Sequence, residues 1–409
     1  MALLLGLSAG SAHAAPAELV LQLDTSLRHD SNPLRFPDAT AVPAALGSGQ
    51  KSTSYFANEI KGALVQALDS PETRLILSGQ LSRQNYQNFN QLDNTEGALR
   101  GIFQWRFGEL WRGELSRMDE RQLYRPLDGS VTDRIMIQAE TTSVLVALRP
   151  TPELEFPVQI TTQKTEHNSA ALQAYDRKDR ILDISARWRT WSTSTLRGGM
   201  RSVRSTFALR TPEQVVAMDS EYEDREIYAG AEWQYSVKTR VSGRLGYLQR
   251  HYGRLTDRDF SVLTADAQLL YDYSPLTRIQ VDVWNRPFGM TDPNNLYSIA
   301  TGMQTSVRWF ATSKVRVTGA FTQEQQSYKP TATGAALGSP VLNRQRWAGG
   351  VVHELTRDLR VYAEGFRESM KRGSLGSDIH QNALRIGLEY SYENLTGVAQ
   401  RNGLAERRQ

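Results

Sequence analysis

The sequence contains one short segment in which the residue types of a hydrolase stand side by side. RHDSNPLRF, residues 28–36, places His29, Asp30 and Ser31 in consecutive positions. These residue types can together activate a serine hydroxyl for attack on an acyl group. In an extended strand, however, neighbouring side chains point to opposite faces, so consecutive residues cannot converge as a triad requires. We therefore predict a strand that ends here and passes into a loop, with Pro33 stopping the hydrogen-bond ladder.

Other patterns associated with catalysis or metal binding are equally weak. GLSAG, residues 6–10, matches the nucleophile-elbow pattern, but that pattern needs a strand-to-helix turn in a mature protein. The six histidines show no H-E-x-x-H or other close metal spacing, and the chain has no cysteine. The sequence therefore predicts a protein that is not an enzyme and has no metal site and no cofactor. An outer-membrane hydrolase is the least favoured alternative.

The amino terminus has the pattern of an export signal. A short apolar stretch is followed by Ala12-His13-Ala14, which resembles a signal-peptidase site. We predict a signal peptide over residues 1–14 that contains the GLSAG match. The basic segment that normally opens such a peptide is missing, so we expect the true start to lie upstream.

The composition does not suit a large globular core. Apolar residues make up 40% of the 409 residues, the mean hydropathy is −0.48, and no long apolar run follows residue 10. The chain carries 40 arginines and eight lysines, spread evenly along it, which argues against a nucleic-acid-binding patch.

The dominant pattern is alternation of apolar and polar residues, which indicates strands with two different faces. It is clear over residues 99–107, 240–250 and 383–392. Eight short breaks, at 69–72, 108–110, 149–152, 191–194, 236–239, 273–276, 310–313 and 356–358, alternate with nine longer polar ones. This pattern predicts an antiparallel, up-and-down transmembrane β-barrel of about 18 strands in the bacterial outer membrane. We assign the barrel to residues 15–393 and a polar tail to 394–409.

Tryptophans gather near the short breaks, where an interfacial aromatic girdle is expected. The six are Trp105, Trp111, Trp188, Trp191, Trp233 and Trp309, whereas Trp284 and Trp347 lie nearer the opposite strand ends.

The polar face of these strands would line an aqueous lumen with an excess of arginine over carboxylates such as Glu140 and Asp183. Guanidinium groups suit carboxylates and phosphates, so an anionic solute or polymer would be favoured. The candidate ligand contacts are Arg100, Arg106, Arg112, Arg187, Arg189, Arg197, Arg201, Arg240, Arg244, Arg278, Arg316, Arg360 and Arg385. The structural alternative is that many of them only form cross-strand ion pairs that stabilise the wall.

Two segments carry a resemblance to a known family. Asp30, Ser31, Asn32 and Arg35 match a D-S-N-x-(F/L)-R signature, although the order Pro33-Leu34-Arg35-Phe36 departs from its commoner form. The second segment, residues 85–97, contributes Tyr86, Asn88, Phe89, Leu92 and Asp93. Both resemble the EpsL-like family of β-barrel porins from exopolysaccharide gene clusters associated with exosortases.

The resemblance implies a role in making or exporting an extracellular polysaccharide, as a conduit for the polymer or an accessory to one. The expected partners are outer-membrane lipid, an acidic extracellular polysaccharide, other export proteins and the barrel-assembly machinery, but not nucleic acid. Two alternatives remain. One is a structural or regulatory barrel plugged by the small-residue-rich loop 327–345, and the other is a general porin for small anionic solutes.

Overall fold

The computed structural model describes residues 17–42, 46, 49–70, 72–125, 133–190, 194–288, 295–330, 341–371 and 378–394. The predicted signal peptide, the tail beyond Asn394, Trp191 and the centre of loop 327–345 lie outside these ranges. Among the described residues, no helix is both long and apolar enough to cross a bilayer.

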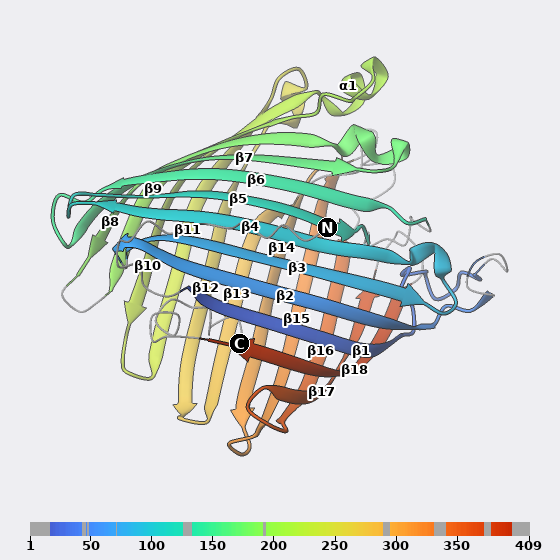
Figure 1. Ribbon diagram of the computed structural model, residues 1–409. Coiled ribbons are helices and arrows are strands. Elements are labelled where there is room, and N and C mark those ends of the chain that lie inside the picture. The colour runs from blue at the N-terminus through green and yellow to red at the C-terminus, as the bar shows by residue number, and fades with distance from the viewer. Residues whose placement is uncertain are drawn as a thin grey trace, which may run out of the picture.

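The described chain forms one closed antiparallel sheet of 18 strands, in which each strand pairs with its sequence neighbours. Strand β1 also pairs with β18, so the sheet has no free edge (Figure 1). The strands are β1 (Glu18–Asp30), β2 (Thr53–Ser70), β3 (Thr73–Tyr86), β4 (Asn94–Phe107), β5 (Trp111–Leu123), β6 (Met136–Leu148), β7 (Leu154–His167), β8 (Arg177–Arg189), β9 (Thr195–Thr206), β10 (Glu221–Gln234), β11 (Thr239–Tyr252), β12 (Phe260–Ser274), β13 (Thr277–Phe288), β14 (Asn295–Phe310), β15 (Val315–Pro330), β16 (Val341–Glu354), β17 (Leu359–Lys371) and β18 (Ile379–Glu393). The predicted up-and-down barrel is confirmed.

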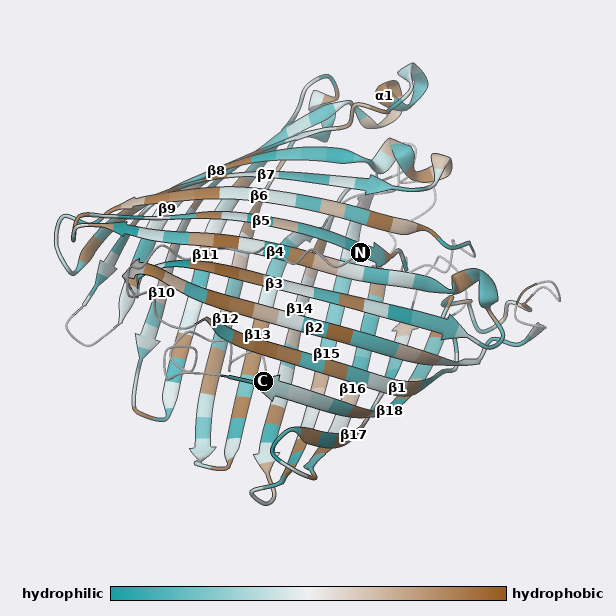
Figure 2. Cartoon of the chain, viewed as in Figure 1, coloured by the Kyte–Doolittle hydropathy of each residue, from teal (hydrophilic) through white to brown (hydrophobic). Residues whose placement is uncertain are grey.

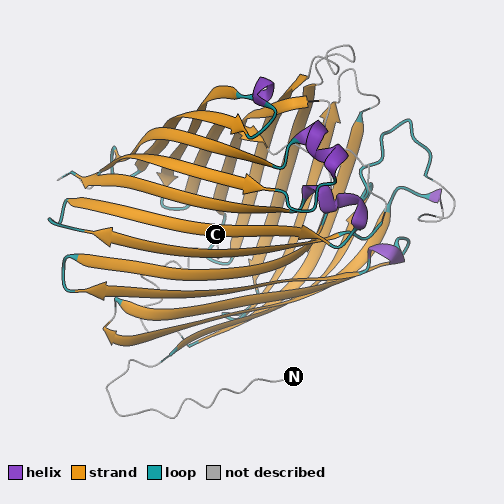
Figure 3. Cartoon of the chain, turned by 90° about the horizontal axis from the view of Figure 1, so that it is seen from above, coloured by secondary structure: helices purple, strands orange, loops and turns teal. Residues whose placement is uncertain are grey.

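Short connections lie at one end of the barrel and long ones at the other, as the spacing of breaks predicts. The helices lie at the long-loop end, which Figure 3 makes plain. Those whose bounds lie within the described residues are η2 (Asn90–Leu92), η3 (Ala170–Tyr175), η4 (Thr256–Arg258) and α1 (Pro212–Met218). In an outer-membrane barrel the long loops face outward, which orients the chain.

The outer surface of the barrel carries large apolar side chains that are exposed. Leu23 is 43%, Ile160 58% and Ile227 66% exposed, and Figure 2 shows apolar residues alternating with polar ones along the strands. A continuous apolar surface of this kind is unfavourable in water but favourable in contact with lipid. The strand pattern and this surface place the protein in the bacterial outer membrane.

The aromatic girdle at the short-turn end is also present. Trp111, Trp188, Trp233 and Trp309 are 39–52% exposed on the outer surface beside the short turns. Trp284 lies on the lumen face instead, where its indole N–H donates to Glu324 (3.1 Å). These four tryptophans therefore mark one membrane interface. Trp284 belongs to the lumen wall, and Trp347, which is 61% exposed, lies on the outer surface opposite Phe321.

One carboxylate expected in the lumen lies outside. Glu140 on β6 pairs in register with Asp119 and Lys164, and it accepts from Arg117 (3.4 Å) on the outer surface. The cause is the sequence of β6, which has apolar residues at five consecutive positions from Val144 to Leu148. Alternation has no clear phase in such a strand, so the two faces cannot be told apart from sequence.

Three of the long loops close by the same device. In each, the last residue of a strand donates its backbone N–H to an aspartate that follows a 3₁₀ helix. The donor–acceptor pairs are Tyr86 to Asp93 (2.7 Å), His167 to Asp176 (2.8 Å) and Tyr252 to Asp259 (2.8 Å). The side chains of His167 and His251 also contact Asp176 and Asp259. These loop-end histidines are therefore partners of loop-closing aspartates.

Candidate functional site

The opening segment is the end of a strand, as predicted. Strand β1 ends at Asp30, and the side chains of His29 and Asp30 point to opposite faces. The His29 ring contacts Ser54 Oγ (3.1 Å), whereas Asp30 is buried, with 3% of it exposed. Asp30 accepts hydrogen bonds from the Asn32 N–H (2.9 Å) and the Gln381 amide (2.8 Å). The hydroxyl of Ser31 accepts from the backbone N–H of Asn382 (2.7 Å). No triad forms from these three residues.

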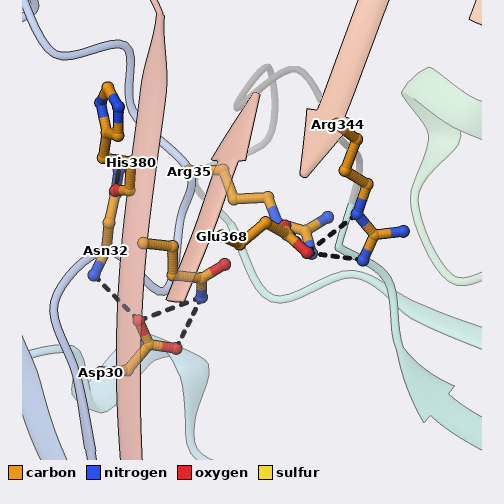
Figure 4. Close-up of polar contacts among 7 residues, drawn as sticks. Asp30, Asn32, Arg35, Arg344, Glu368 and His380 are labelled. Atoms are coloured by element: carbon orange, nitrogen blue, oxygen red, sulfur yellow. Dashed lines mark hydrogen bonds and ion pairs between the residues drawn. The ribbon is translucent and has the colours of Figure 1, made fainter. Parts of the chain in front are cut away.

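The residues of the first segment that resembles the EpsL-like family tie the first long loop to the barrel (Figure 4). The amide of Asn32 accepts from the Phe36 N–H (2.9 Å) and donates to the Phe36 carbonyl (2.8 Å). Arg35 has a left-handed backbone (φ 55°), and its guanidinium pairs with Glu368 (3.4 Å). Glu368 also pairs with Arg344 (2.6 Å). Burial lowers the pKa of Arg35 because it disfavours the charged form. The negative charge of Glu368 offsets this cost of burying the Arg35 guanidinium.

The second motif packs onto the first. Tyr86, Phe89 and Leu92 form one buried cluster with Leu34, Phe36 and Tyr55, which we call the mouth cluster. The Tyr55 and Tyr86 rings stack 4.4 Å apart, and the Asn88 N–H donates to Thr53 Oγ1 (3.3 Å). The structure thus uses the motif side chains to build the outer rim of the barrel.

A different serine, histidine and aspartate do meet, on the outer surface. The ring of His380 lies 3.2 Å from Ser369 Oγ and 2.5 Å from Asp38 Oδ2. Ser369 lies within the sheet, in register with His380 on one side and Gln345 on the other. Its backbone amide belongs to the ladder and is not free to stabilise an oxyanion, so the contact is best explained as a tether of the first loop.

The thirteen candidate arginines all lie on the face opposite the apolar surface, which is the lumen wall. Several are held by carboxylates: Arg106 by Glu72, Arg112 and Arg187 by Glu155, Arg278 by Asp272 and Arg360 by Glu389. Arg240 donates to Gln234 (3.0 Å). For Arg100, Arg189 and Arg201, no ion pair is found within the described residues. The lumen wall therefore contains both structural and available arginines.

Arg197 and Arg244 meet at one aromatic ring. Their guanidinium carbons lie 5.2 and 4.0 Å from the centre of the Tyr228 ring. The hydroxyl of Tyr228 donates to Asp183 (2.7 Å), which also pairs with Arg197 (3.0 Å). Arg244 pairs with Glu226 (2.7 Å). We call this arrangement, whose residues come from β8 to β11, the Tyr228 cluster. It holds Arg197 on β9 and Arg244 on β11 in position.

The same arrangement recurs half-way round the barrel. Tyr362 donates to Asp24 (2.6 Å), Arg385 pairs with Asp24 (2.9 Å), and the Arg385 guanidinium carbon lies 4.6 Å from the Tyr362 ring centre. These residues lie on β17, β18 and β1, nine strands from the Tyr228 cluster in the closed order of 18. The two Asp–Tyr–Arg groups therefore occupy opposite walls.

Glycines opposite the tyrosines make this packing feasible. Tyr228 pairs in register with Gly199 and Gly246, and Tyr362 pairs with Gly387. A Cβ on Gly199 would lie 2.8 Å from the Tyr228 hydroxyl, and one on Gly387 would lie 2.3 Å from the Tyr362 hydroxyl. The sequence contains these glycines, but their role depends on strand register, so the tyrosine clusters could not be found from sequence spacing.

A cleft opens beside the Tyr228 cluster on the wall formed by β8 to β13. Its cavity volume is about 470 Å³, which is within the range of small-molecule sites. Arg187, Arg197, Arg244 and Arg286 line it together with Tyr228 and Trp284. Asp266, Asp282 and Glu232 are also in its wall. Within the described residues, no group of histidines and carboxylates is arranged to hold a metal ion.

Comparison with known proteins supports the fold. No protein-family model and no curated protein matches the chain. The chain does resemble solved structures of about its own length. The fold is that of an outer-membrane porin.

A BenF-like porin from Pseudomonas fluorescens Pf-5 gives a TM-score of 0.52 at 10% identity, covering 92% of this chain and 98% of that one. Pseudomonas aeruginosa OccK2 (OpdF) in complex with glucuronate gives 0.52 at 10% identity, covering 93% and 98%. Pseudomonas aeruginosa OpdK with vanillate gives 0.51 at 10% identity, covering 92% and 99%. At these identities the similarity concerns the fold alone.

Proposed function

We propose that this chain is a non-enzymatic outer-membrane channel that admits small anionic solutes, in particular those with a carboxylate. The observation that carries the proposal is the cleft on the β8 to β13 wall, where four arginines stand beside Tyr228 and Trp284. A guanidinium group binds a carboxylate with two parallel hydrogen bonds, and an aromatic ring offers a stacking surface to a flat or cyclic solute.

The carboxylates of the same wall suit a channel better than a tight receptor. Asp183 and Glu226 already pair with Arg197 and Arg244, so an incoming anion must compete with them. Conduction requires binding that is favourable enough for entry and weak enough for release. Two porin-fold proteins similar to this chain have been solved with the carboxylates glucuronate and vanillate, which is consistent with this solute class.

The test is single-channel recording of the purified protein in a planar bilayer, with glucuronate or vanillate added. We expect brief, concentration-dependent interruptions of the current by either solute. Arg197→Gln combined with Arg244→Gln removes both cations of the Tyr228 cluster, and we expect this variant to lose the interruptions while still conducting. Arg367→Gln removes an arginine of the outer surface and is the matched control. Interruptions that persist unchanged in the double variant would contradict the proposed site.

A second candidate, export of an acidic polysaccharide, keeps a specific observation in its favour. The two segments that resemble the EpsL-like family pack against each other in the mouth cluster, where a polymer would leave the barrel. Deleting the gene tests this candidate. A cell without the protein should then export less polymer, whereas normal export would leave only the small-solute channel.

A further inference from the structure

The outer surface of β7, β8 and β9 carries four cations close together. Lys164 on β7 lies directly opposite Lys178 on β8, and Arg180 on β8 lies directly opposite Arg204 on β9. Like charges at directly opposed positions of an antiparallel sheet destabilise it. We call these four residues the outer basic cluster.

The surrounding carboxylates pair with the edges of this cluster and leave its centre free. Lys164 pairs with Glu166 and Arg204 with Glu221, both at 2.7 Å. Glu140 and Glu223 lie opposite Lys164 and Arg204 in register, on the far sides of the cluster. Lys178 and Arg180 are exposed, and within the part of the chain that the structure describes they form no ion pair. The two central cations are therefore available to an anion.

The level of the cluster in the membrane points to the source of that anion. On β8 the outward residues run from Trp188 at the short-turn girdle through Ile184 and Leu182 to Arg180. Eight residues of a strand tilted by about 40° rise roughly 20 Å, close to the height of the apolar band of such barrels. Arg180 and Lys178 therefore lie at the outer end of the apolar band, at the level of the lipid headgroups.

Cations that lie directly opposite each other on the outer surface occur only on β7, β8 and β9 among the described strands. Other outward cations near the long-loop end lie opposite uncharged residues in register, as Arg83, Arg117, Arg121 and Arg367 do. At a similar level on β13 to β16, the outward residues are uncharged: Asn285, Thr301, Gln323, Gln325, Asn343 and Gln345. A general attraction for the membrane surface would not require this asymmetry, whereas a site for one headgroup would.

We propose that the outer basic cluster binds the phosphate groups of an anionic glycolipid in the outer leaflet, with Lys178 and Arg180 as its central contacts. An occupant with two phosphates can place one between Lys164 and Lys178 and the other between Arg180 and Arg204. Each phosphate would relieve a like-charge pair and accept charge-assisted hydrogen bonds from both partners. This site is separate from the lumen, so it is independent of the solute that the channel carries.

The test measures binding of diphosphoryl lipid A to the purified barrel in detergent micelles by microscale thermophoresis. We expect the double variant Lys178→Gln, Arg180→Gln to bind at least about tenfold more weakly, because it loses two charge-assisted contacts. Arg367→Gln is the matched control, since Arg367 lies on the outer surface of β17 away from the cluster and should bind like the parent. The slower migration of boiled samples in gels verifies that each variant is folded.

Three results would overturn the proposal. The first is equal affinity of the double variant and the parent, and the second is an equal loss of affinity in the Arg367→Gln control. The third is displacement of the lipid by inorganic phosphate at the same phosphate concentration, which would indicate a site for free phosphate. Failure of inorganic phosphate to compete, together with loss of lipid binding in the double variant alone, would support the lipid as the occupant.

Discussion

The mouth cluster and the Tyr228 cluster are both built around tyrosine rings, but they differ in which side chains they leave accessible. In the mouth cluster Phe89 is fully buried, and Glu368, which anchors the first loop beside it, is 1% exposed. In the Tyr228 cluster, Arg197 and Arg244 keep 38% and 32% of their side chains exposed and line a cleft. The motif residues thus stabilise a rim, while the arginines beside Tyr228 are available to a solute.

The largest effect is expected from the core of the mouth cluster. Phe89→Ala empties a fully buried aromatic site, and we expect the free energy of unfolding to fall by about 3–5 kcal/mol. Urea titration of the barrel in micelles measures this change. Folded Phe89→Ala protein should still show carboxylate interruptions of the current. A loss of the interruptions would mean that the mouth cluster itself contacts the solute.

A smaller effect is expected in the lumen, where Gly199→Ala tests the packing of Tyr228. The new Cβ would lie 2.7 Å from the Ile184 carbonyl oxygen and 2.8 Å from the Tyr228 hydroxyl, so the wall must shift. We expect a loss of about 1–3 kcal/mol in unfolding free energy and weaker interruption by glucuronate. Gly319→Ala is the control, because a Cβ there meets nothing within 4 Å. Equal behaviour of the two variants would show that the position of Tyr228 does not matter.

The smallest effect concerns the loop of α1 and its dependence on pH. Although burial opposes ionisation of Asp219, hydrogen bonds from the backbone N–H groups of Arg254, Leu255 and Ser220 lower its pKa. A carboxylate with a lowered pKa stabilises the folded loop above its ordinary pKa of 3.8, and this contribution disappears as the pH falls through the lower folded value. Hydrogen exchange at Arg254 and Leu255 should therefore stay slow, after correction for intrinsic rates, down to about pH 4. It should speed up at lower pH, and an unchanged protection factor would contradict this role of Asp219.

Much of the fold follows from the sequence because a lipid-facing strand must alternate. The positions of the breaks give all 18 strands, and the alternation places the thirteen arginines on the lumen face. The prediction that Glu140 faces the lumen is wrong because β6 is apolar on both faces near its short-turn end. The candidate site is harder to predict from the sequence. Tyr228, Asp183 and Arg197 come together only through the register of β8, β9 and β10. Sequence alternation gives the face of a residue but not its height on the wall.

The two segments that resemble the EpsL-like family show the opposite limit. Asp30, Asn32 and Phe89 are easy to single out because they match the family signature. In the structure, however, their side chains are buried and hold the long loops in place. A short loop motif in a barrel can therefore identify how the rim is built without identifying the solute.

The central claim is that the lumen arginines favour anions, and the reversal potential in a potassium chloride gradient tests it most directly. The protein is reconstituted in a planar bilayer with more salt on one side, and the voltage of zero current is measured. Our account predicts a reversal potential with the sign of chloride selectivity, which moves toward zero when Arg197 and Arg244 are both changed to glutamine. A potential with the sign of potassium selectivity, in protein verified as folded, would contradict it.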